Sequence, residues 1–220
     1  MSGTVKITGG RKLKGEVTPI ANKNSMMAVI PAAVLSHQTI VYKDVPRTSD
    51  IQKLCSIIQK LGGEVIDRGD GELRINCKNL DSYRVDEELG SSFRASLNFV
   101  GPLLARFGVA EVPLPGGCDL GMRSIEAHLF ALRKVGVSAS CSNKMVRFTA
   151  PKKVEKHYRV WQIEASVTAT ENLAMYAAFI GSEVEIIDAA SEPHVIDLLN
   201  FLSEMGADIT GINTNRLRIK

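Results

Sequence analysis

A unit of one helix, a glycine and two short strands recurs three times in this chain of 220 residues, and no other feature restricts the fold as much. The copies span residues 51–75, 125–148 and 195–219. In the first copy, apolar residues at helical spacing predict one buried face on the helix: Ile51, Leu54, Cys55, Ile58 and Leu61. A glycine just past the last apolar position predicts where each helix ends, at Gly62, Gly136 and Gly206.

A second helix is predicted ahead of each copy, over residues 24–36, 91–107 and 168–182. These helices are apolar nearly all round, which is typical of helices buried on every side. Each leads into a short strand, so the full unit reads helix, strand, helix, strand, strand. Three such units predict an α/β fold in which helices pack inside a surrounding set of mixed sheets. Pro31 and Pro102 fall inside two of these helices and should kink or break them.

Composition and patterning exclude several functional classes. The net charge of +3 is too small to predict a nucleic-acid or membrane-surface partner, and no apolar run reaches the 18 residues of a membrane-spanning helix. The N-terminus lacks the apolar core of a secretory signal, so a cytoplasmic location is expected. The four cysteines and four histidines lack metal-ligand spacing, and no nucleotide-cofactor motif is present, so neither metal nor cofactor is expected.

Two cationic residues stand where buried helices are predicted to begin. Lys23, followed by Asn24, precedes the first apolar helix, and Arg94 lies in the first turn of the second. A cation near the positive end of a helix is unfavourable unless an anion lies between them. The alternative is a solvated lysine in a turn and a surface arginine that buries only its aliphatic stem.

Cys118 lies in a segment rich in glycine and proline, residues 113–126, which has no apolar pattern of its own. An exposed cysteine in a cytosolic protein is a candidate acid or nucleophile, and Arg123, five residues later, could stabilise its thiolate. The alternative is an incidental loop cysteine. The other three cysteines fall on apolar faces and are expected to pack in the core: Cys55, Cys77 and Cys141.

Hydroxyl side chains gather ahead of the third buried helix, at Ser166 and Thr168. Thr168 and Glu171 fit a capping box, and Ser124 is predicted to cap the helix that follows the cysteine segment. Hydroxyls beside helix amides suit a phosphate group, although an ordinary helix cap has the same residues. Together with the cations and the thiol, they favour a doubly anionic substrate.

These motifs resemble those of the UDP-N-acetylglucosamine 1-carboxyvinyltransferases, a family of enolpyruvyl transferases in the EPSP synthase-like superfamily. The cysteine segment is the most specific match, since the related shikimate-phosphate transferases lack that cysteine. The matching segments cover the chain in the family's order: L-x-G-E-V (13–17), K-N (23–24), FRAS (93–96), LARFG (104–108), LPGGCDLGMR (114–123), SVTATEN (166–172) and EPHVIDLLNFL-x-x-MGADI-x-G (192–211).

The resemblance implies a protein of two similar inside-out α/β barrels, each built of three repeats. It implies that residues 1–21 are a strand stub of an otherwise missing second domain, and that residues 22–215 form the first domain. Residues 216–220 would be a return strand toward the second domain. Because that domain supplies the family's proposed aspartate base and a further arginine, this half alone is expected to be inactive.

The resemblance also implies a reaction, the first committed step of peptidoglycan synthesis. Enolpyruvyl passes from phosphoenolpyruvate to the 3′-hydroxyl of UDP-N-acetylglucosamine by addition and then elimination of phosphate. By the same resemblance, Lys23, Arg94 and Arg123 would neutralise phosphoenolpyruvate, and Cys118 would be the general acid that fosfomycin alkylates. The implied substrate-binding residues are Asn24, Ser124, Ile125, Glu126, Ala127, His128, Ser166, Val167 and Thr168.

The sequence departs from the family pattern in three substrate-facing segments. Residues 20–22 read I-A-N where S-G-A is usual, Ser124 replaces a proline, and Thr168 replaces a glycine. These changes predict a divergent member with an altered acceptor preference. Two other hypotheses are a UDP-sugar-binding half-enzyme without turnover and a nucleic-acid-end enzyme of the RNA 3′-phosphate cyclase fold. The low net charge and the lack of a catalytic histidine motif disfavour the cyclase.

Overall fold

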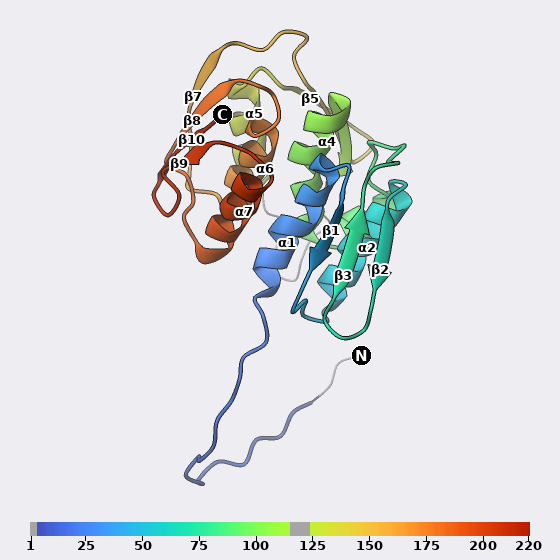
Figure 1. The fold of residues 1–220 in the computed structure, drawn as a ribbon, viewed down its shortest axis with the longest axis vertical. Coiled ribbons are helices and arrows are strands. Elements are labelled where there is room, and N and C mark those ends of the chain that lie inside the picture. The colour runs from blue at the N-terminus through green and yellow to red at the C-terminus, as the bar shows by residue number, and fades with distance from the viewer. Residues whose placement is uncertain (1–3, 115–123) are drawn as a thin grey trace.

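The helices and strands repeat the predicted order of helix, strand, helix, strand, strand along the chain (Figure 1). The computed structural model describes residues 4–114 and 124–220. The first unit contains α1 (Lys23–Ala32), β1 (Thr39–Tyr42), α2 (Ser49–Lys60), β2 (Glu64–Asp67) and β3 (Leu73–Asn76). The second contains α4 (Val100–Phe107), β4 (Val109–Pro113), α5 (Glu126–Lys134), β5 (Ser138–Ser142) and β6 (Met145–Thr149). The third contains α6 (Val167–Ala177), β8 (Glu183–Ile187), α7 (Pro193–Glu204), β9 (Ile209–Thr210) and β10 (Arg216–Ile219).

Further elements lie between these, and they divide a helix that the sequence predicted to be continuous. They are the 3₁₀ helix η1 (Ala33–Leu35), the short helix α3 (Glu87–Ser91), the 3₁₀ helix η2 (Arg94–Phe99) and the strand β7 (His157–Trp161). The prediction of one helix over 91–107 is therefore wrong. Pro102 has no N–H to donate to the carbonyl of Asn98, and α-helical bonding does not extend back across that point.

Pro31 creates a similar gap inside α1, and another helix fills it. The proline cannot donate to the carbonyl of Met27, four residues earlier, so that carbonyl loses its usual partner. The side-chain Nδ2 of Asn98 donates to it instead, at 3.3 Å. The break in helix bonding thus becomes a contact between α1 and η2.

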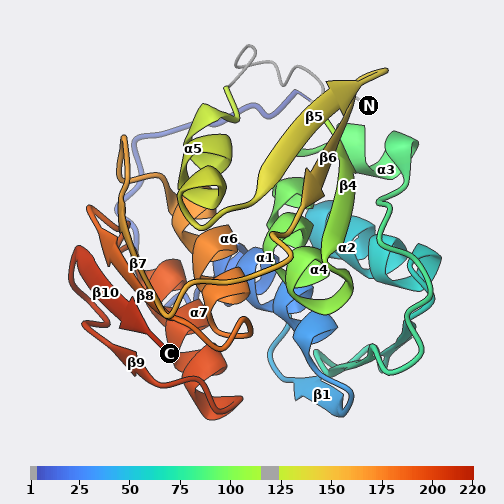
Figure 2. The same ribbon diagram turned by 90° about the horizontal axis from the view of Figure 1, so that it is seen from above.

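The described strands form three sheets, with the orders β1-β3-β2, β4-β6-β5 and β7-β8-β10-β9. Only β7 and β8 pair in parallel, and the other neighbours are antiparallel. Figure 2 shows the β4-β6-β5 sheet and the β7-β8-β10-β9 sheet on different sides of α1, α4 and α6. The first helix of each unit therefore lies between sheets, as its apolar sequence predicted.

The packing of these helices explains why they lack a polar face. Every residue of α6 from Ala169 to Ala177 is buried. The backbones of α4 and α6 approach closely at Gly101, where an added Cβ would stand 2.2 Å from the carbonyl oxygen of Asn172. The amide side chain of Asn172 closes the same contact, because its Oδ1 accepts the Gly101 N–H at 2.7 Å. An alanine at 101 would have to push the two helices apart.

The second helix of each unit is amphipathic and has one buried face, as predicted. In α2 the buried residues are Ile51, Leu54, Ile57 and Ile58, and in α7 they are Val195, Leu198, Leu199 and Leu202. The predicted stop glycines follow these helices and all have positive φ: Gly62 at 96°, Gly136 at 86° and Gly206 at 109°. A residue with a Cβ rarely adopts this conformation, so glycine is suited to these three helix ends.

The two ends of the described chain differ in structure. Residues 4–22 form an extended segment without helix or strand, and Val5 and Ile7 are exposed (Figure 1). At the other end, β10 pairs with β8 and β9, and its Leu217 and Ile219 are fully buried. Residues 216–219 therefore lie in the β7-β8-β10-β9 sheet, while the predicted division into domains at 21 and 215 stays a prediction.

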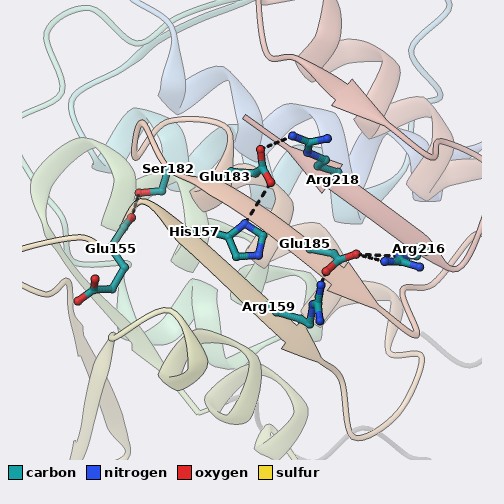
Figure 3. A network of polar contacts seen from close by, with 8 residues as sticks. All are labelled: Glu155, His157, Arg159, Ser182, Glu183, Glu185, Arg216 and Arg218. Atoms are coloured by element: carbon teal, nitrogen blue, oxygen red, sulfur yellow. Dashed lines mark hydrogen bonds and ion pairs between the residues drawn. The ribbon is translucent and has the colours of Figure 1, made fainter.

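The β7-β8-β10 face carries a ladder of charges (Figure 3). Glu185 of β8 bonds Arg159 of β7 and Arg216 of β10, the latter through Nε at 2.7 Å. Hydrogen bonds from these arginines, Arg216 above all, lower the pKa of Glu185. One step along β8, Glu183 bonds Arg218 and lies 3.1 Å from Nδ1 of His157. We call these six residues the charge ladder.

Candidate anion site at the helix starts

Lys23 stands at the start of α1 and forms an ion pair with the first turn of α2. Its Nζ lies 2.6 Å from Oδ2 of Asp50, and its side chain remains 47% exposed. Asn22 caps α1, because its Oδ1 accepts the N–H of Asn24 at 2.9 Å. Lys23 is thus both exposed and ion-paired, and Asp50 is a neighbour that the sequence did not single out.

Arg94 links the start of η2 to the segment that leads into α5. Its Nη2 donates to the carbonyl oxygen of Ser124 at 3.1 Å. Lys53 of α2 lies beside the same segment: its Nζ is 5.3 Å from the centroid of the Phe93 ring and 3.5 Å from the carbonyl oxygen of Ser92. Cationic side chains from α1, α2 and η2 thus gather near the helix starts.

The start of α6 joins the start of α5 through one side-chain pair. Nε2 of His128 lies 2.9 Å from Oγ1 of Thr168. Ser166 is the residue before α6, and its side chain makes no capping hydrogen bond. The N–H groups of the first turn therefore have no side-chain cap, as an anion-binding helix end requires.

His128 is a buried, neutral imidazole. Only 1% of the residue is exposed. Burial lowers its pKa to about 3, and the nearby positive charge of Arg94 lowers it further in the same direction. At neutral pH this histidine therefore contributes hydrogen bonds and no charge.

The capping box predicted for Thr168 and Glu171 is wrong. Glu171 is 2% exposed and turns into the helix core, where its Oε2 accepts from Nδ2 of Asn98 at 2.8 Å. Burial raises the pKa of Glu171 to about 8, while the Asn98 bond opposes that rise. A glutamate in the first turns of an apolar helix suggested a cap, and its burial was not visible in the sequence.

The remaining predicted residues divide into polar contacts and packing. The Oγ of Ser124 accepts the N–H of Glu126 at 3.0 Å, but the N-cap position of α5 is held by Ile125, one residue later than predicted. Glu126 is exposed and lies 3.6 Å from Arg133. Ala127 is buried, Ile125 packs against the core, and Val167 is half-buried, so these three offer backbone groups only. Two further predicted residues lie outside the described part of the chain: Cys118 and Arg123.

The prediction that Cys141 packs in the core is wrong. Cys141 is exposed because β5 is an edge strand of the β4-β6-β5 sheet, whereas Cys77 is buried and Cys55 half-buried. Burial raises the pKa of both Cys55 and Cys77 to about 11.

Iodoacetamide is expected to label Cys141 of the native protein and to spare Cys55 and Cys77. The thiolate is the reacting form, and their raised pKa values should slow both by about 100-fold relative to an ordinary thiol. Peptide mapping after a short exposure measures this, with a urea-unfolded sample as the control for full labelling. Cys118 is predicted from the sequence to react as well. Labelling of Cys77 as fast as Cys141 would contradict the burial of Cys77.

Other site types find no support in the described residues. Within residues 4–114 and 124–220, no group of three or more histidine, cysteine, aspartate or glutamate side chains is arranged to hold a metal ion. Among the same residues, no helix has both the length and the apolarity needed to cross a membrane.

The chain is similar to known proteins along most of its length. The sequence pattern of the EPSP synthase (3-phosphoshikimate 1-carboxyvinyltransferase) family matches residues 7–220. A UDP-N-acetylglucosamine 1-carboxyvinyltransferase from Shewanella sp. strain W3-18-1 is 38% identical over 94% of this chain and 49% of its own length. The UDP-N-acetylglucosamine 1-carboxyvinyltransferase 3 of Caldanaerobacter subterraneus subsp. tengcongensis is 39% identical over 97% of this chain and 50% of its own. The chain therefore spans about half the length of these relatives.

Solved structures show the same fold at low sequence identity. The enolpyruvyl transferase NikO from Streptomyces tendae superposes with a TM-score of 0.80 at 19% identity, over 96% of this chain and 49% of its own. EPSP synthase from Acinetobacter baumannii gives a TM-score of 0.70 at 17% identity, over 93% of this chain and 46% of its own. At such identities the likeness concerns the fold alone.

Proposed function

The chain belongs to the EPSP synthase family, and on that premise we propose that it forms the N-terminal half of an enolpyruvyl transferase. Its three units would form one inside-out barrel, with residues 4–22 joining the sheet of a second domain. The extended form of those residues and the coverage of only half of each relative support this.

The proposed reaction moves enolpyruvyl from phosphoenolpyruvate to a hydroxyl of the acceptor. The hydroxyl gives its proton to a base as its oxygen bonds to the central carbon of phosphoenolpyruvate, and the methylene carbon gains a proton to become a methyl group. Elimination then breaks the bond between the central carbon and the phosphate oxygen, removes a proton from the methyl group and releases phosphate. Each step handles a strongly anionic substrate, so the enzyme needs fixed cations and N–H donors around it.

The observation that carries the proposal is a cationic side chain at each of two helix starts, Lys23 at α1 and Arg94 at η2. Lys23 is half-exposed and oriented by Asp50, and Arg94 is oriented by the carbonyl of Ser124. We assign these two cations to the phosphate and carboxylate of phosphoenolpyruvate, with Asn24 beside them. Arg123 would be a third cation and Cys118 the general acid, as the family resemblance implies.

We further propose UDP-N-acetylglucosamine as the acceptor, bound along residues 124–128 and 166–168. The names of the two curated relatives support this, and so does the uncapped start of α6. The reaction would serve peptidoglycan synthesis in the cytoplasm, where both substrates are made. The departures at Ser124 and Thr168 leave a second candidate, an enolpyruvyl transferase with another acceptor, and a third, a half-enzyme that binds the nucleotide sugar without turnover.

A chimeric protein tests the proposal. Residues 1–220 are fused to the part of the Caldanaerobacter relative that this chain does not match, and phosphate release is measured with both substrates. We expect turnover that requires both, and a loss of about 100-fold in kcat/KM for phosphoenolpyruvate in Lys23→Met and in Arg94→Met. Lys60→Met is the matched control, since Lys60 at the end of α2 forms a similar exposed ion pair with Asp86 and has no assigned role in binding either substrate. Equal losses in all three variants would contradict the assigned roles.

A further inference from the structure

The side-chain amide of Asn98 in η2 has a fixed orientation and one unmatched oxygen. Its Nδ2 donates to the carbonyl oxygen of Met27 in α1 at 3.3 Å and to Oε2 of Glu171 in α6 at 2.8 Å. Turning the amide over would bring Oδ1 against the Met27 carbonyl, which can only accept. Oδ1 is therefore an acceptor that points away from Met27, and among residues 4–114 and 124–220 it has no hydrogen-bond partner.

Glu171 is the neighbour that can supply the missing hydrogen. Asn98 and Glu171 are each 2% exposed, and a buried acceptor without a donor is costly. A protonated carboxyl carries one O–H and keeps a second oxygen that accepts. An acid and an amide can therefore bond twice, through N–H to the acid carbonyl oxygen and through O–H to the amide oxygen. The bond from Nδ2 of Asn98 to Oε2 is the first half of such a pair.

The surroundings of Glu171 keep a proton on its carboxyl at neutral pH. Burial raises the pKa of Glu171 to about 8, and the negative charge of Glu192, the residue just ahead of α7, acts in the same direction. The hydrogen bond from Asn98 opposes that rise. An ionised Glu171 would bury a negative charge and leave Oδ1 of Asn98 without a donor. The proton removes both costs at once.

The bonds of Asn98 connect three buried helices close to their starts. Met27 lies four residues after Lys23 in α1, and Asn98 lies four residues after Arg94 in η2. Glu171 lies in the second turn of α6. Fixing these points relative to one another fixes how far apart the two cations stand. A misplacement of about 1 Å can reduce an enzyme's rate by about 100-fold, so this spacing matters for turnover.

We infer that Glu171 donates its proton to Oδ1 of Asn98, and that this doubly bonded pair positions the cations at the starts of α1 and η2. Both side chains act through Lys23 and Arg94, so they are positioning residues. The positioning role rests on the proposed function, whereas the pairing itself does not depend on it.

Infrared difference spectroscopy of the 220-residue chain at pH 7 tests the pairing without any ligand. We expect the wild type to show the carbonyl band of a protonated carboxylic acid, and Glu171→Gln to lack it. In Asn98→Leu the band should move to higher frequency, because the acid loses both hydrogen bonds to the amide. A wild type without this band would overturn the pairing, and so would an unchanged frequency in Asn98→Leu.

The chimera tests the positioning role. We expect Glu171→Leu to lose about tenfold or more in kcat/KM for phosphoenolpyruvate. Glu171→Gln should stay within about twofold of the wild type, since glutamine can also bond Asn98 twice. Val112→Ala, a truncation of a buried residue in β4, controls for reduced stability and should also stay within about twofold.

Wild-type activity in Glu171→Leu would overturn the positioning role, as would an equal loss in Glu171→Gln. A wild-type chimera without turnover would overturn the proposed function and the positioning role with it. The infrared bands would still decide whether Asn98 and Glu171 are paired.

Discussion

Replacing Glu171 by glutamine is expected to raise the melting temperature by roughly 10 °C at pH 9 and by little at pH 4. The pKa of Glu171 is about 8 in the folded protein, against 4.5 for a free side chain, because burial disfavours the charged form. Between pH 4.5 and about pH 8, the Glu171 carboxyl is protonated in the folded state and ionised in the unfolded state. Stability therefore falls as pH rises from about 4.5 to about 8.

The size of this effect follows from the shift in pKa. Each pKa unit corresponds to about 1.4 kcal/mol, so above pH 8 the ionisation of Glu171 lowers the free energy of unfolding by on the order of 5 kcal/mol. Glutamine keeps the acceptor oxygen for Asn98 and cannot ionise. Thermal unfolding of wild type and variant at several pH values measures the difference. Glu204→Gln, the same change on the exposed end of α7, is the control and should change little. If the melting temperature of Glu171→Gln exceeded that of the wild type by the same amount at every pH, Glu171 could not be a buried carboxyl that is protonated below pH 8.

Phosphate release by the 220-residue chain alone is expected to remain at background with both substrates present. Lys23 and Arg94 are partly exposed, and a phosphoenolpyruvate bound only to them stays in contact with water, where each ion pair contributes little. The base proposed for the acceptor hydroxyl would also come from the second domain.

The chimera provides the positive control for this result, since the same residues should support turnover once a second domain covers them. A Cys118→Ala variant of the isolated chain is the negative control. Clear turnover by the isolated chain that disappears in Cys118→Ala would show that the 220 residues form a complete active site. The proposal of a two-domain enzyme would then have to be given up.

The order of elements could be predicted because each unit repeats the same hydrophobic periods and the same glycine stops. The sequence did not predict strand β7. His157, Arg159 and Trp161 are exposed, and Val160 is the one fully buried residue of the strand, so the segment lacks a clear run of buried apolar positions. The alternation of Tyr158 and Val160 with those residues was the available signal. The edge position of Cys141 could not be predicted, because strand order depends on contacts that no local pattern encodes.

The candidate site could be predicted in part. The positions of Lys23 and Arg94 next to predicted helices showed that both stand at helix starts. Their partners could not be predicted, because Asp50 and the carbonyl of Ser124 belong to distant parts of the sequence. Thr168 was visible as a departure from the family pattern. Its contact with His128, forty residues earlier, appears only when α5 and α6 pack together.

The charge ladder has a consequence for how the chain selects its topology. Both carboxylates lie on β8, and arginines lie on the strands to either side. If β8 and β10 exchanged places, β7 and β10 would become neighbours, and Arg159 would face Arg216 and Arg218 with no carboxylate between them. Like charges on adjacent strands are destabilising. The charge ladder therefore favours the observed strand order, in which the acidic strand β8 lies between the basic strands β7 and β10.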